Sequence, residues 1–524
     1  MVGLVEQQMS AFPINSRIKV SNDYGTVKFF GEIKGYSGLW VGVEWDDPRR
    51  GKHSGCVNEI QYFETTCPNA GSMIRPGKIA PFDSLAGAIE KRYVLNIGNP
   101  LDENLMREAK ENVKASIFEF VGAEKIMKKQ SHVEHLEDIS VAYSNAQTAG
   151  NLMPFCNLVT VNLTATLIWN WKIVADIASQ LPRLSYLNLS QNRLVLPSDL
   201  DIVDLEPSFR HLKDINLSDC GLSSFEDILH IAKLFPWIES LSLQKNNISQ
   251  LIAPDCDVVF KNLHYLDLHK NNLSSFDEIL KLGNIVNLKV LLLMQNGLQR
   301  INLPDCEATE YVEIFPNLME INLRDNPIEN EIETFNELDK LKSLAILNQT
   351  PDPKSGFENM FSRAVGLISH LRQLNKISVN SGNRRDAEYD IWKLYGWEYL
   401  QTSGSPTERK KFMKKIRTYG RIVEKYGSPD ESLVRPQVKV SSVVAVNLLD
   451  PEANRLVPKK LPKKMTIQAL QGLVLKLFKS NAGSLPILSY VDAERQDVCV
   501  VLDNMSRTLD YYSIQDGDTI IIQW

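Results

Sequence analysis

The stretch Leu-His-Tyr-Leu-Asp-Leu-His-Lys-Asn-Asn-Leu, residues 263–273, decides the fold of the middle of this chain. It follows the pattern L-x-x-L-x-L-x-x-N-x-L, which recurs along the sequence. Strong copies begin at residues 184, 238, 263, 288 and 318, and weaker copies at 136, 158, 212 and 341. The middle copies start 25 to 30 residues apart. A period of this length indicates stacked copies of one small structural unit.

The chemistry of the pattern predicts how each copy folds. The two leucines of L-x-L point inward from a short parallel strand, and the Asn side chain bonds backbone groups at the turn that follows. One copy cannot bury its own apolar face, so the copies must stack into a curved α/β solenoid. This is the leucine-rich-repeat pattern. We expect the repeats over residues 136–350 and a helical, Arg-rich C-terminal cap over 351–400.

The residues that alternate with the inward leucines should face the concave side of the solenoid. They are mostly polar, but the copy at 288 presents Val290, Leu292 and Met294 there, beside Tyr265. An apolar patch on a polar face predicts a protein-binding site. The alternative is that the C-terminal cap or the last domain covers this patch within the molecule.

The N-terminal segment is dense in glycine and aromatic residues, and its short β-type runs are broken by turn signals, which predicts a compact all-β domain. Tyr24–Gly31, Leu39–Asp46, Gly51–Gly55, Tyr62-Phe63 and Arg75-Pro76 follow one another in the order and spacing of a CAP-Gly domain. We assign residues 10–90 to a barrel that resembles this family. The resemblance implies binding of C-terminal tails that end in Glu-Glu-Tyr or Glu-Glu-Phe, as on α-tubulin.

The residues of this segment suit such a ligand. A free carboxylate beside acidic side chains requires a cation and exposed backbone N–H groups, which Lys52 and a glycine-flanked turn supply. A terminal aromatic ring requires an aromatic slot. The predicted tail-binding residues are Phe29, Trp40, Gly51, Lys52, His53, Ser54, Gly55, Phe63 and Arg75. The alternative for the three aromatic rings is that they form the core of this small domain.

The segment departs from the family pattern Gly-Lys-Asn-Asp-Gly at two positions, where His53 and Ser54 replace Asn and Asp. Glu59 also stands where a glycine is common. Because Ser54 lacks a carboxylate that could order the loop, we expect a weaker affinity for the tail than is typical of the family.

The last section, residues 438–524, has the pattern of an α+β unit. Strands are predicted over 443–449, 487–491, 498–502 and 519–523, and an amphipathic helix over 466–479. Residues 508–515 resemble the turn before the final strand of ubiquitin, so we interpret the section as a ubiquitin-like β-grasp domain. The sequence ends at Trp524 without Gly-Gly, which favours a docking or structural module over a conjugated one.

Two connecting segments are expected between these domains. Residues 91–135 are rich in Glu, Lys and Ala and suggest a helical connection, and residues 401–437 suggest a linker that begins with a helix. The linker carries a basic run between Arg409 and Arg417. A solvated helix face is the favoured interpretation, and a nuclear address or an anionic docking patch are the alternatives.

Composition excludes several classes of function. The net charge of −6 disfavours a nucleic-acid partner, and no stretch approaches 18 consecutive apolar residues, which disfavours a membrane span. The seven cysteines are scattered and never spaced as Cys-x-x-Cys, so we expect reduced thiols and no zinc site. No catalytic constellation or phosphate loop is present, so we expect no enzyme and no cofactor.

The order CAP-Gly, leucine-rich repeats and ubiquitin-like domain resembles the tubulin-folding cofactor E family over nearly the whole chain. The resemblance implies capture of α-tubulin for assembly with β-tubulin, with tubulin-folding cofactors B, C and D as partners, and dissociation of the heterodimer with cofactor B. It implies a cytoplasmic, cytoskeleton-associated protein. A microtubule-associated adaptor and a shuttle that brings tubulin to the proteasome are the alternatives.

Overall fold

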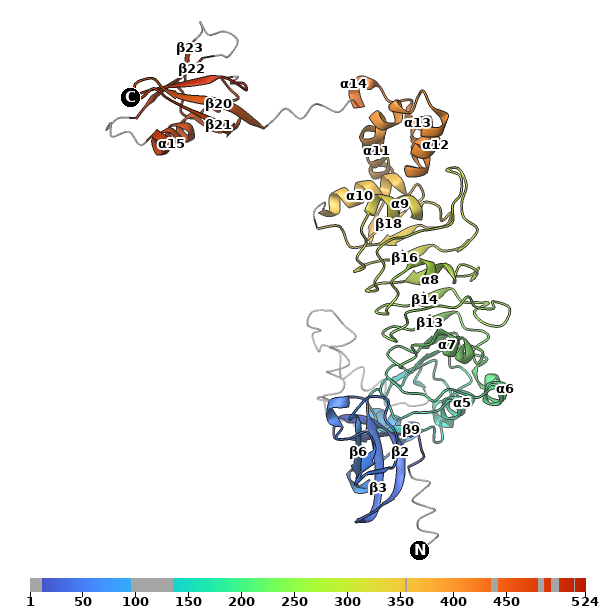
Figure 1. Ribbon diagram of the computed structural model, residues 1–524. Helices are drawn as coiled ribbons and strands as arrows, with labels where there is room; N and C mark the ends of the chain where they lie inside the picture. The colour runs from blue at the N-terminus through green and yellow to red at the C-terminus, as the bar shows by residue number, and fades with distance from the viewer. Residues whose placement is uncertain are drawn as a thin grey trace. The chain divides into compact units, whose positions relative to one another are not determined.

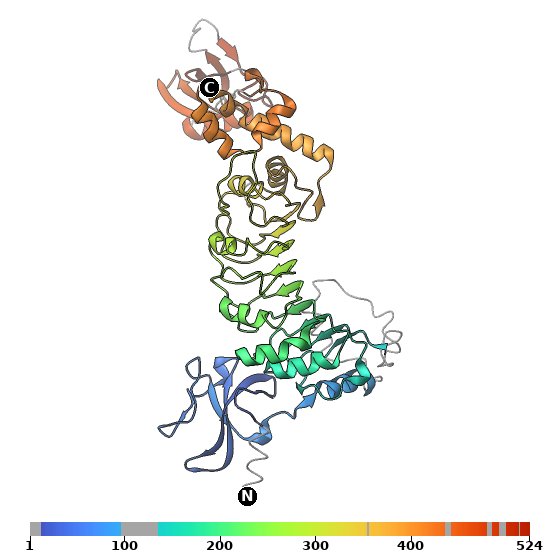
Figure 2. The same ribbon diagram turned by 90° about the vertical axis from the view of Figure 1, so that its right-hand side faces the viewer.

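The computed structural model describes residues 12–95, 135–353, 356–434, 442–478, 485–491, 499–512 and 514–524. The chain divides into two compact units, Met1–Leu433 and Val434–Trp524 (Figures 1 and 2). Most of the expected helical connection, residues 96–134, lies outside the described part of the chain.

The first unit begins with a small β domain. Its four-stranded antiparallel sheet has the order β1-β2-β3-β6, with bounds Arg17–Val20, Asp23–Ile33, Tyr36–Trp45 and Gly71–Ile74. The hairpin of β4 (Cys56–Val57) and β5 (Ile60–Gln61) and two 3-10 turns, η1 (Pro48–Arg50) and η2 (Pro76–Lys78), complete the domain. Ile18, Val27, Val41, Val43 and Trp45 form its core, as the alternation of apolar residues along these strands requires.

The repeats form an 11-stranded sheet that is parallel up to its last pair of strands. Each copy of the pattern contributes one short strand whose central residue is buried. The last weak copy was placed three residues too early: Leu347 pairs with Ile321, so this copy begins at Leu344 and not at Leu341. The strands in spatial order are β8 (Asp138–Ser140), β10 (Thr160–Asn162), β11 (Tyr186–Asn188), β12 (Asp214–Asn216), β13 (Ser240–Ser242), β14 (Tyr265–Asp267), β15 (Val290–Leu292), β16 (Glu320–Asn322), β17 (Ile346–Asn348), β18 (Gln373–Leu374) and β19 (Ile377–Ser378).

The α-helices between the strands begin at Ser or Asn caps, whereas the two 3-10 turns that follow Leu152 and Leu205 have no side-chain cap. Each cap side chain accepts a backbone N–H of the first turn, as at Ser224 and Asn330. The helices are η5 (Met153–Phe155), α5 (Trp171–Gln180), α6 (Asp199–Leu205), η6 (Glu206–Phe209), α7 (Phe225–Ala232), α8 (Phe276–Leu280) and α9 (Glu331–Leu338).

The asparagine of the pattern joins consecutive repeats, as its position at the turn predicts. The Asn271 side-chain amide donates to the carbonyls of Leu268, at 2.9 Å, and Leu243, at 3.0 Å, and its oxygen accepts the N–H of Asn246 at 3.0 Å. Cys220 takes this place in the copy at 212, where its thiol donates to the Leu189 carbonyl and burial raises its pKa to about 12. That cysteine is therefore a neutral structural residue.

A short segment after the β domain covers the first repeat. Strand β7 (Asp83–Ser84) pairs in parallel with β9 (Ala146–Thr148), and α2 (Leu85–Glu90) buries Leu85 and Ile89 before the π-turn η3 (Lys91–Leu95). The buried Gln147 side chain also donates to the Arg17 carbonyl at 3.1 Å. The β domain is thus held to the repeats by several direct contacts.

Five helices close the other end of the solenoid: α10 (Gly356–Leu367), α11 (Ser381–Gln401), α12 (Pro406–Lys415), α13 (Tyr419–Tyr426) and α14 (Glu431–Val434). Residues 406–426, expected as part of a linker, are helical and are tied to the last repeats. Asn336 accepts the Arg417 N–H at 2.8 Å and donates to the Lys414 carbonyl at 3.0 Å. Lys410 and Lys414 form ion pairs with Glu307 and Asp305 on a repeat loop. The four lysines of the basic run stay exposed while they form ion pairs, as the solvated-face interpretation expects, whereas Arg417 is buried.

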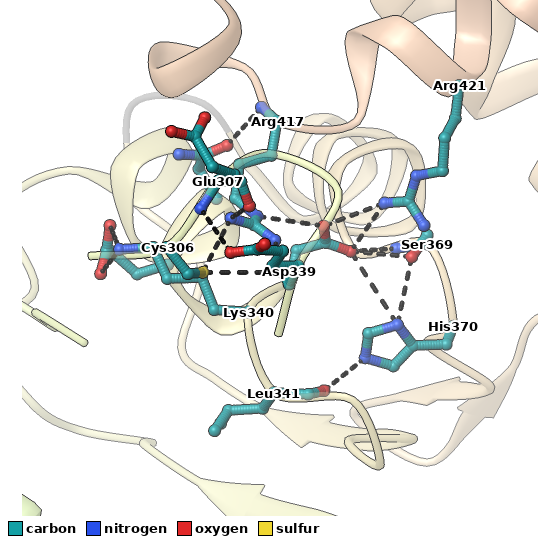
Figure 3. A network of polar contacts seen from close by, with 12 residues as sticks. Cys306, Glu307, Asp339, Lys340, Leu341, Ser369, His370, Arg417 and Arg421 are labelled. Carbon is teal, nitrogen blue, oxygen red and sulfur yellow. Dashed lines mark hydrogen bonds and ion pairs between the residues drawn. The ribbon is translucent and has the colours of Figure 1, made fainter. Parts of the chain in front are cut away.

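A buried charge network joins these helices to the repeats (Figure 3). Asp339 has no exposed surface, and its carboxylate accepts from the Arg421 guanidinium at 2.9 Å and from the Ser369 N–H at 2.9 Å. Arg417 lies between this carboxylate, 3.5 Å from its Nε, and the carbonyl of Glu307, 3.1 Å from its Nη1. The pKa of the neighbouring His370 is lowered by burial.

The second unit is a five-stranded sheet with one helix, in the order β21-β20-β24-β22-β23. Its elements are β20 (Val443–Asp450), β21 (Arg455–Pro462), α15 (Ile467–Phe478), β22 (Ile487–Val491), β23 (Cys499–Val501) and β24 (Thr519–Gln523). The first and last strands are parallel and the helix crosses between them, which is the β-grasp topology expected. Sequence analysis missed β21 because Pro458 and Pro462 argue against a strand.

Candidate functional site

The Gly51–Gly55 loop of the β domain is pinned to β6. The N–H groups of Lys52 and His53 both donate to the Gly71 carbonyl, at 2.7 and 3.1 Å, and the Gly71 N–H donates back to the His53 carbonyl at 2.8 Å. Only glycine fits at the two ends. A Cβ on Gly51 would lie 2.0 Å from the Asn69 carbonyl oxygen, and Gly55, with a φ of +92°, would place one 1.8 Å from the Phe63 oxygen. The glycines let the loop pack against its own domain.

His53 and Ser54, the two departures from the family pattern, both order this loop. The His53 Nδ1 accepts the Gly55 N–H at 3.0 Å, and the Ser54 hydroxyl accepts the Asn69 N–H at 3.0 Å. The pKa of His53 is lowered, first by burial and then by the charge of Lys52. A neutral imidazole is the form that accepts a hydrogen bond, so the lowered pKa preserves this contact.

Lys52 is exposed on this loop, and within the described residues its ammonium forms no ion pair. Its charge is available to an outside ligand. It also acts on His53, which makes the His53 pKa a local reporter of the lysine.

The three aromatic residues predicted to form a slot have different environments. Phe63 is buried and lies over the glycines of the sheet, because a Cβ on Gly42 would meet its ring at 2.5 Å. Phe29 is half-buried and contacts Tyr62 edge to face, with ring centroids 5.1 Å apart. Phe63 therefore has the environment expected of a ring in the core of the domain, whereas Phe29 keeps part of its ring exposed.

Trp40 sits between a cation and a second ring. The Arg75 guanidinium lies 3.8 Å from its ring centroid, and Tyr36 meets it edge to face at 5.9 Å. The indole N–H is buried and has no hydrogen-bond partner in the described part of the chain. Tyr36 and Tyr62 were not among the predicted site residues. The sequence did offer a sign of them, because Tyr36 stands near Trp40 and Tyr62 next to Phe63, in a segment rich in glycine and aromatic residues.

Glu59 explains why a glycine is common at its position. Asn58 and Glu59 form the two-residue turn between β4 and β5, with φ values of 49° and 65°. Both angles lie in the left-handed region, which favours glycine and is unfavourable for a residue with a Cβ.

Changing Glu59 to glycine is expected to raise the free energy of unfolding of the β domain by about 0.5–1 kcal/mol. The change relieves the strain of a left-handed backbone at a residue with a Cβ, and this gain exceeds the entropic cost of ordering a glycine on folding. Urea denaturation of the full chain would measure it. Asn58→Gly is the matched control. It should raise the free energy of unfolding by only a few tenths of a kcal/mol, because asparagine adopts a left-handed backbone with little strain. Equal gains from both variants would contradict the strain at Glu59.

The second predicted site lies on the sheet of the solenoid. The parallel register places Val290 between Tyr265 and Glu320, and Leu292 between Asp267 and Asn322. Tyr265, Val290, Leu292 and Met294 are all partly exposed, so the cap helices of the same unit do not bury them. Burial, followed by the nearby carboxylates, raises the pKa of Tyr265 to about 12, and its hydroxyl is therefore neutral. In the register of the sheet, Val290 and Leu292 thus have the buried Asp267 on one neighbouring strand and Glu320 on the other.

Neither a metal centre nor a membrane span emerges from the described residues. They contain no group of three or more His, Cys, Asp or Glu side chains placed to hold a metal ion. In the described ranges, every helix is too short or too polar to cross a bilayer.

Comparison with known proteins agrees with these domains. The CAP-Gly domain model matches residues 14–79, and the ubiquitin-like domain model matches residues 443–523. A solution structure of the C-terminal ubiquitin-like domain of mouse tubulin-specific chaperone e is 23% identical, with 17% of this chain and 93% of that chain covered and a TM-score of 0.15. A Listeria monocytogenes internalin C2 structure is 21% identical, with 42% of this chain and 82% of that chain covered and a TM-score of 0.29.

Several curated relatives match along the full length. Tubulin-specific chaperone E of Drosophila melanogaster is 47% identical, with 100% of both chains covered. The protein of that name from Mus musculus is 33% identical, with 98% of both chains covered, and the one from Homo sapiens is 30% identical, with 98% of this chain and 99% of that chain covered. With nearly its whole length aligned at 30% to 47% identity, the chain belongs to the tubulin-specific chaperone E family.

Proposed function

We propose that this chain is a tubulin chaperone that captures α-tubulin through two contacts. The Gly51–Gly55 loop and its neighbouring aromatic rings hold the acidic C-terminal tail, and the apolar patch of Tyr265, Val290, Leu292 and Met294 holds the folded body. Captured α-tubulin is then assembled with β-tubulin, in exchange with tubulin-folding cofactors B, C and D, in the cytoplasm. The same contacts support dissociation of the finished heterodimer.

The exposed Lys52 ammonium carries the tail part of this proposal. It sits on a loop that is hydrogen-bonded to β6, forms no ion pair with the described residues, and belongs to the same small domain as half-exposed Phe29 and Trp40. A tail that ends in a carboxylate, acidic side chains and an aromatic ring offers a partner for each of these groups. Arg75 already stacks on Trp40, so it orders that ring and adds positive charge next to it.

Two contacts on one client strengthen each other. Once the tail is held, the body is kept near the solenoid at a high effective concentration, and a modest second contact becomes sufficient. The β domain is joined to the first repeat by the β7–β9 pair and the Gln147 hydrogen bond, so both sites belong to the same unit of the chain.

Gel filtration of the full chain with α/β-tubulin, with and without cofactor B, tests the function directly. We expect α-tubulin to leave the heterodimer and to elute with this chain when cofactor B is present. Elution of intact heterodimer alone, under both conditions, would rule out the dissociation activity.

Lys52→Ala is expected to weaken binding of an α-tubulin tail peptide by about 1–3 kcal/mol, because a charge-assisted hydrogen bond is lost. Fluorescence anisotropy with a labelled tail peptide measures the affinity. Lys78→Ala, at another exposed lysine of the same domain, is the matched control and should leave it unchanged.

The same variant has an internal check that does not depend on the ligand. Because the charge of Lys52 lowers the pKa of His53, Lys52→Ala should raise that pKa in an NMR titration. A raised His53 pKa together with unchanged peptide affinity would remove Lys52 from the tail site.

A further inference from the structure

The edge strand β21 of the second unit carries a row of cations without carboxylate partners. Lys459 and Lys460 lie on the strand, and Lys463 and Lys464 follow it. In the part of this unit that the structure describes, none of these four lysines has a carboxylate oxygen within 4.0 Å. The lysines of α12 differ, since all four are in ion pairs. Four uncompensated charges on one short segment create a local positive potential.

The fold leaves these lysines unneutralised on both sides of the strand. The cross-strand neighbours of Lys459 and Lys460 are Val446 and Ala445, and residues 443–449 of β20 carry no charge. On its other side β21 has no strand neighbour, because it ends the sheet. Opposite charges across a strand pair are the usual source of compensation in a sheet, and here they are missing.

The backbone of β21 disfavours recognition by simple strand addition. Pro458 and Pro462 are two of its eight residues and lack the N–H that an added strand would require. Lysine and proline on an edge strand also protect it from pairing with other chains. A ligand at this edge must therefore be held mainly by side chains.

Apolar side chains beside the lysines complete the surface. Val457 on β21 and Leu473, Leu477 and Phe478 on α15 are only partly buried where they pack on the core. Arg455 lies over the Phe478 ring, 5.1 Å from its centroid. Cations that flank half-exposed apolar side chains suit a segment with both carboxylates and apolar groups.

We propose that β21 and the adjoining face of α15 bind an acidic, extended segment of the tubulin client. The identity of the client rests on the proposed function, whereas the ligand chemistry rests on the unpaired lysines. Successive side chains of β21 point to opposite faces of the sheet, so Lys459 lies on the side of Val457 and α15, and Lys460 on the other side. The segment runs along the edge of the sheet, where ion pairs to lysines of both sides and apolar contact with the helix hold it. This gives the second unit a role as a further, salt-sensitive contact for acidic chains.

A short glutamate peptide with an amidated C-terminus separates this surface from the Lys52 site, because it lacks the free carboxylate and terminal ring of a tubulin tail. We expect the full chain to bind the labelled peptide in an anisotropy assay. The double variant Lys459→Glu, Lys460→Glu should weaken binding about tenfold, and added salt should weaken wild-type binding. If the lysines serve only to keep this edge strand from pairing with other chains, glutamate does so equally well, and the double variant should bind the peptide as the wild type does.

The control is the double variant Lys261→Glu, Lys342→Glu, which makes the same change in total charge on exposed lysines of the first unit. It should bind the peptide as the wild type does, and so should Lys52→Ala. If both double variants weaken peptide binding equally, the total charge alone explains the loss, and the inference is overturned. Absence of wild-type binding would also overturn it, while leaving the tail-peptide result with Lys52→Ala as the separate test of the proposed function.

Discussion

Replacing Asp339 with alanine is expected to lower the free energy of unfolding of the first unit by about 3–5 kcal/mol, because removing one partner of a buried ion pair leaves the other charge uncompensated. Arg417 is 4% exposed, so its charge stays largely buried when its carboxylate is lost. The Ser369 N–H and hydroxyl would lose their acceptor as well.

The effect should be local to the C-terminal cap. Arg417 and Arg421 flank the start of α13, so amides of Tyr419–Tyr426 should exchange faster in hydrogen-exchange mass spectrometry. Urea denaturation gives the free energy itself. Asp305→Ala is the matched control, because its ion pair with Lys414 is exposed on both sides and such pairs contribute about 0–1 kcal/mol. Equal losses from the two variants would mean that the buried network adds nothing special to the cap.

Replacing Leu292 with aspartate should weaken capture of α-tubulin by about 2–4 kcal/mol, the cost of losing a central apolar contact in an interface. The new carboxylate would lie next to Asp267 in the register of the sheet, in the middle of the patch. A partner that buries this patch would then have to bury an unpaired charge.

Tail-peptide binding should be unaffected by this change, since Leu292 is remote in sequence and belongs to a different sheet from the Gly51–Gly55 loop. Co-elution of α-tubulin on gel filtration measures capture, and thermal unfolding checks that the half-exposed position tolerates the substitution. Val258→Asp is the matched control: Val258 is also an exposed apolar residue of the repeats, but it lies outside the strands. Intact capture by Leu292→Asp would show that the concave patch is not the second contact.

The repeats could be predicted because their signal is periodic and every copy repeats the same physical requirement. Even the weak copy at 212 forms its strand, and Cys220 there donates a hydrogen bond in place of asparagine. The β-grasp topology was predicted from the strand and helix patterns together with the resemblance of residues 508–515 to ubiquitin. The prediction failed at β21, whose prolines are tolerated only because the strand lies at the edge of the sheet. Prolines and lysines are found on edge strands, but they are as common in loops, so they do not by themselves predict a strand.

The candidate sites were harder to predict, because the sequence of a motif does not reveal which of its side chains face solvent and which face the core of the domain. Lys52 and Phe63 belong to one motif, yet the lysine is exposed and the ring is buried over glycines of the sheet. The lysines near residue 410 are exposed, as expected, but the sequence did not reveal that the acidic partners of Lys410 and Lys414 lie about a hundred residues earlier, on a repeat loop. Contacts over such sequence distances depend on the stacking of all the intervening repeats.

The strand β7 and helix α2 have a consequence for dividing the chain into fragments. A cut at residue 90 would leave them with the β domain, although β7 pairs with β9 and the Ala86 N–H donates to Ala149 of the first repeat. The remaining repeats would begin with an uncovered end and an unpaired strand, which is the condition that makes solenoids aggregate. A fragment of the repeats that begins before Asp83 keeps its own cover, and the boundary of the β domain then falls near Phe82.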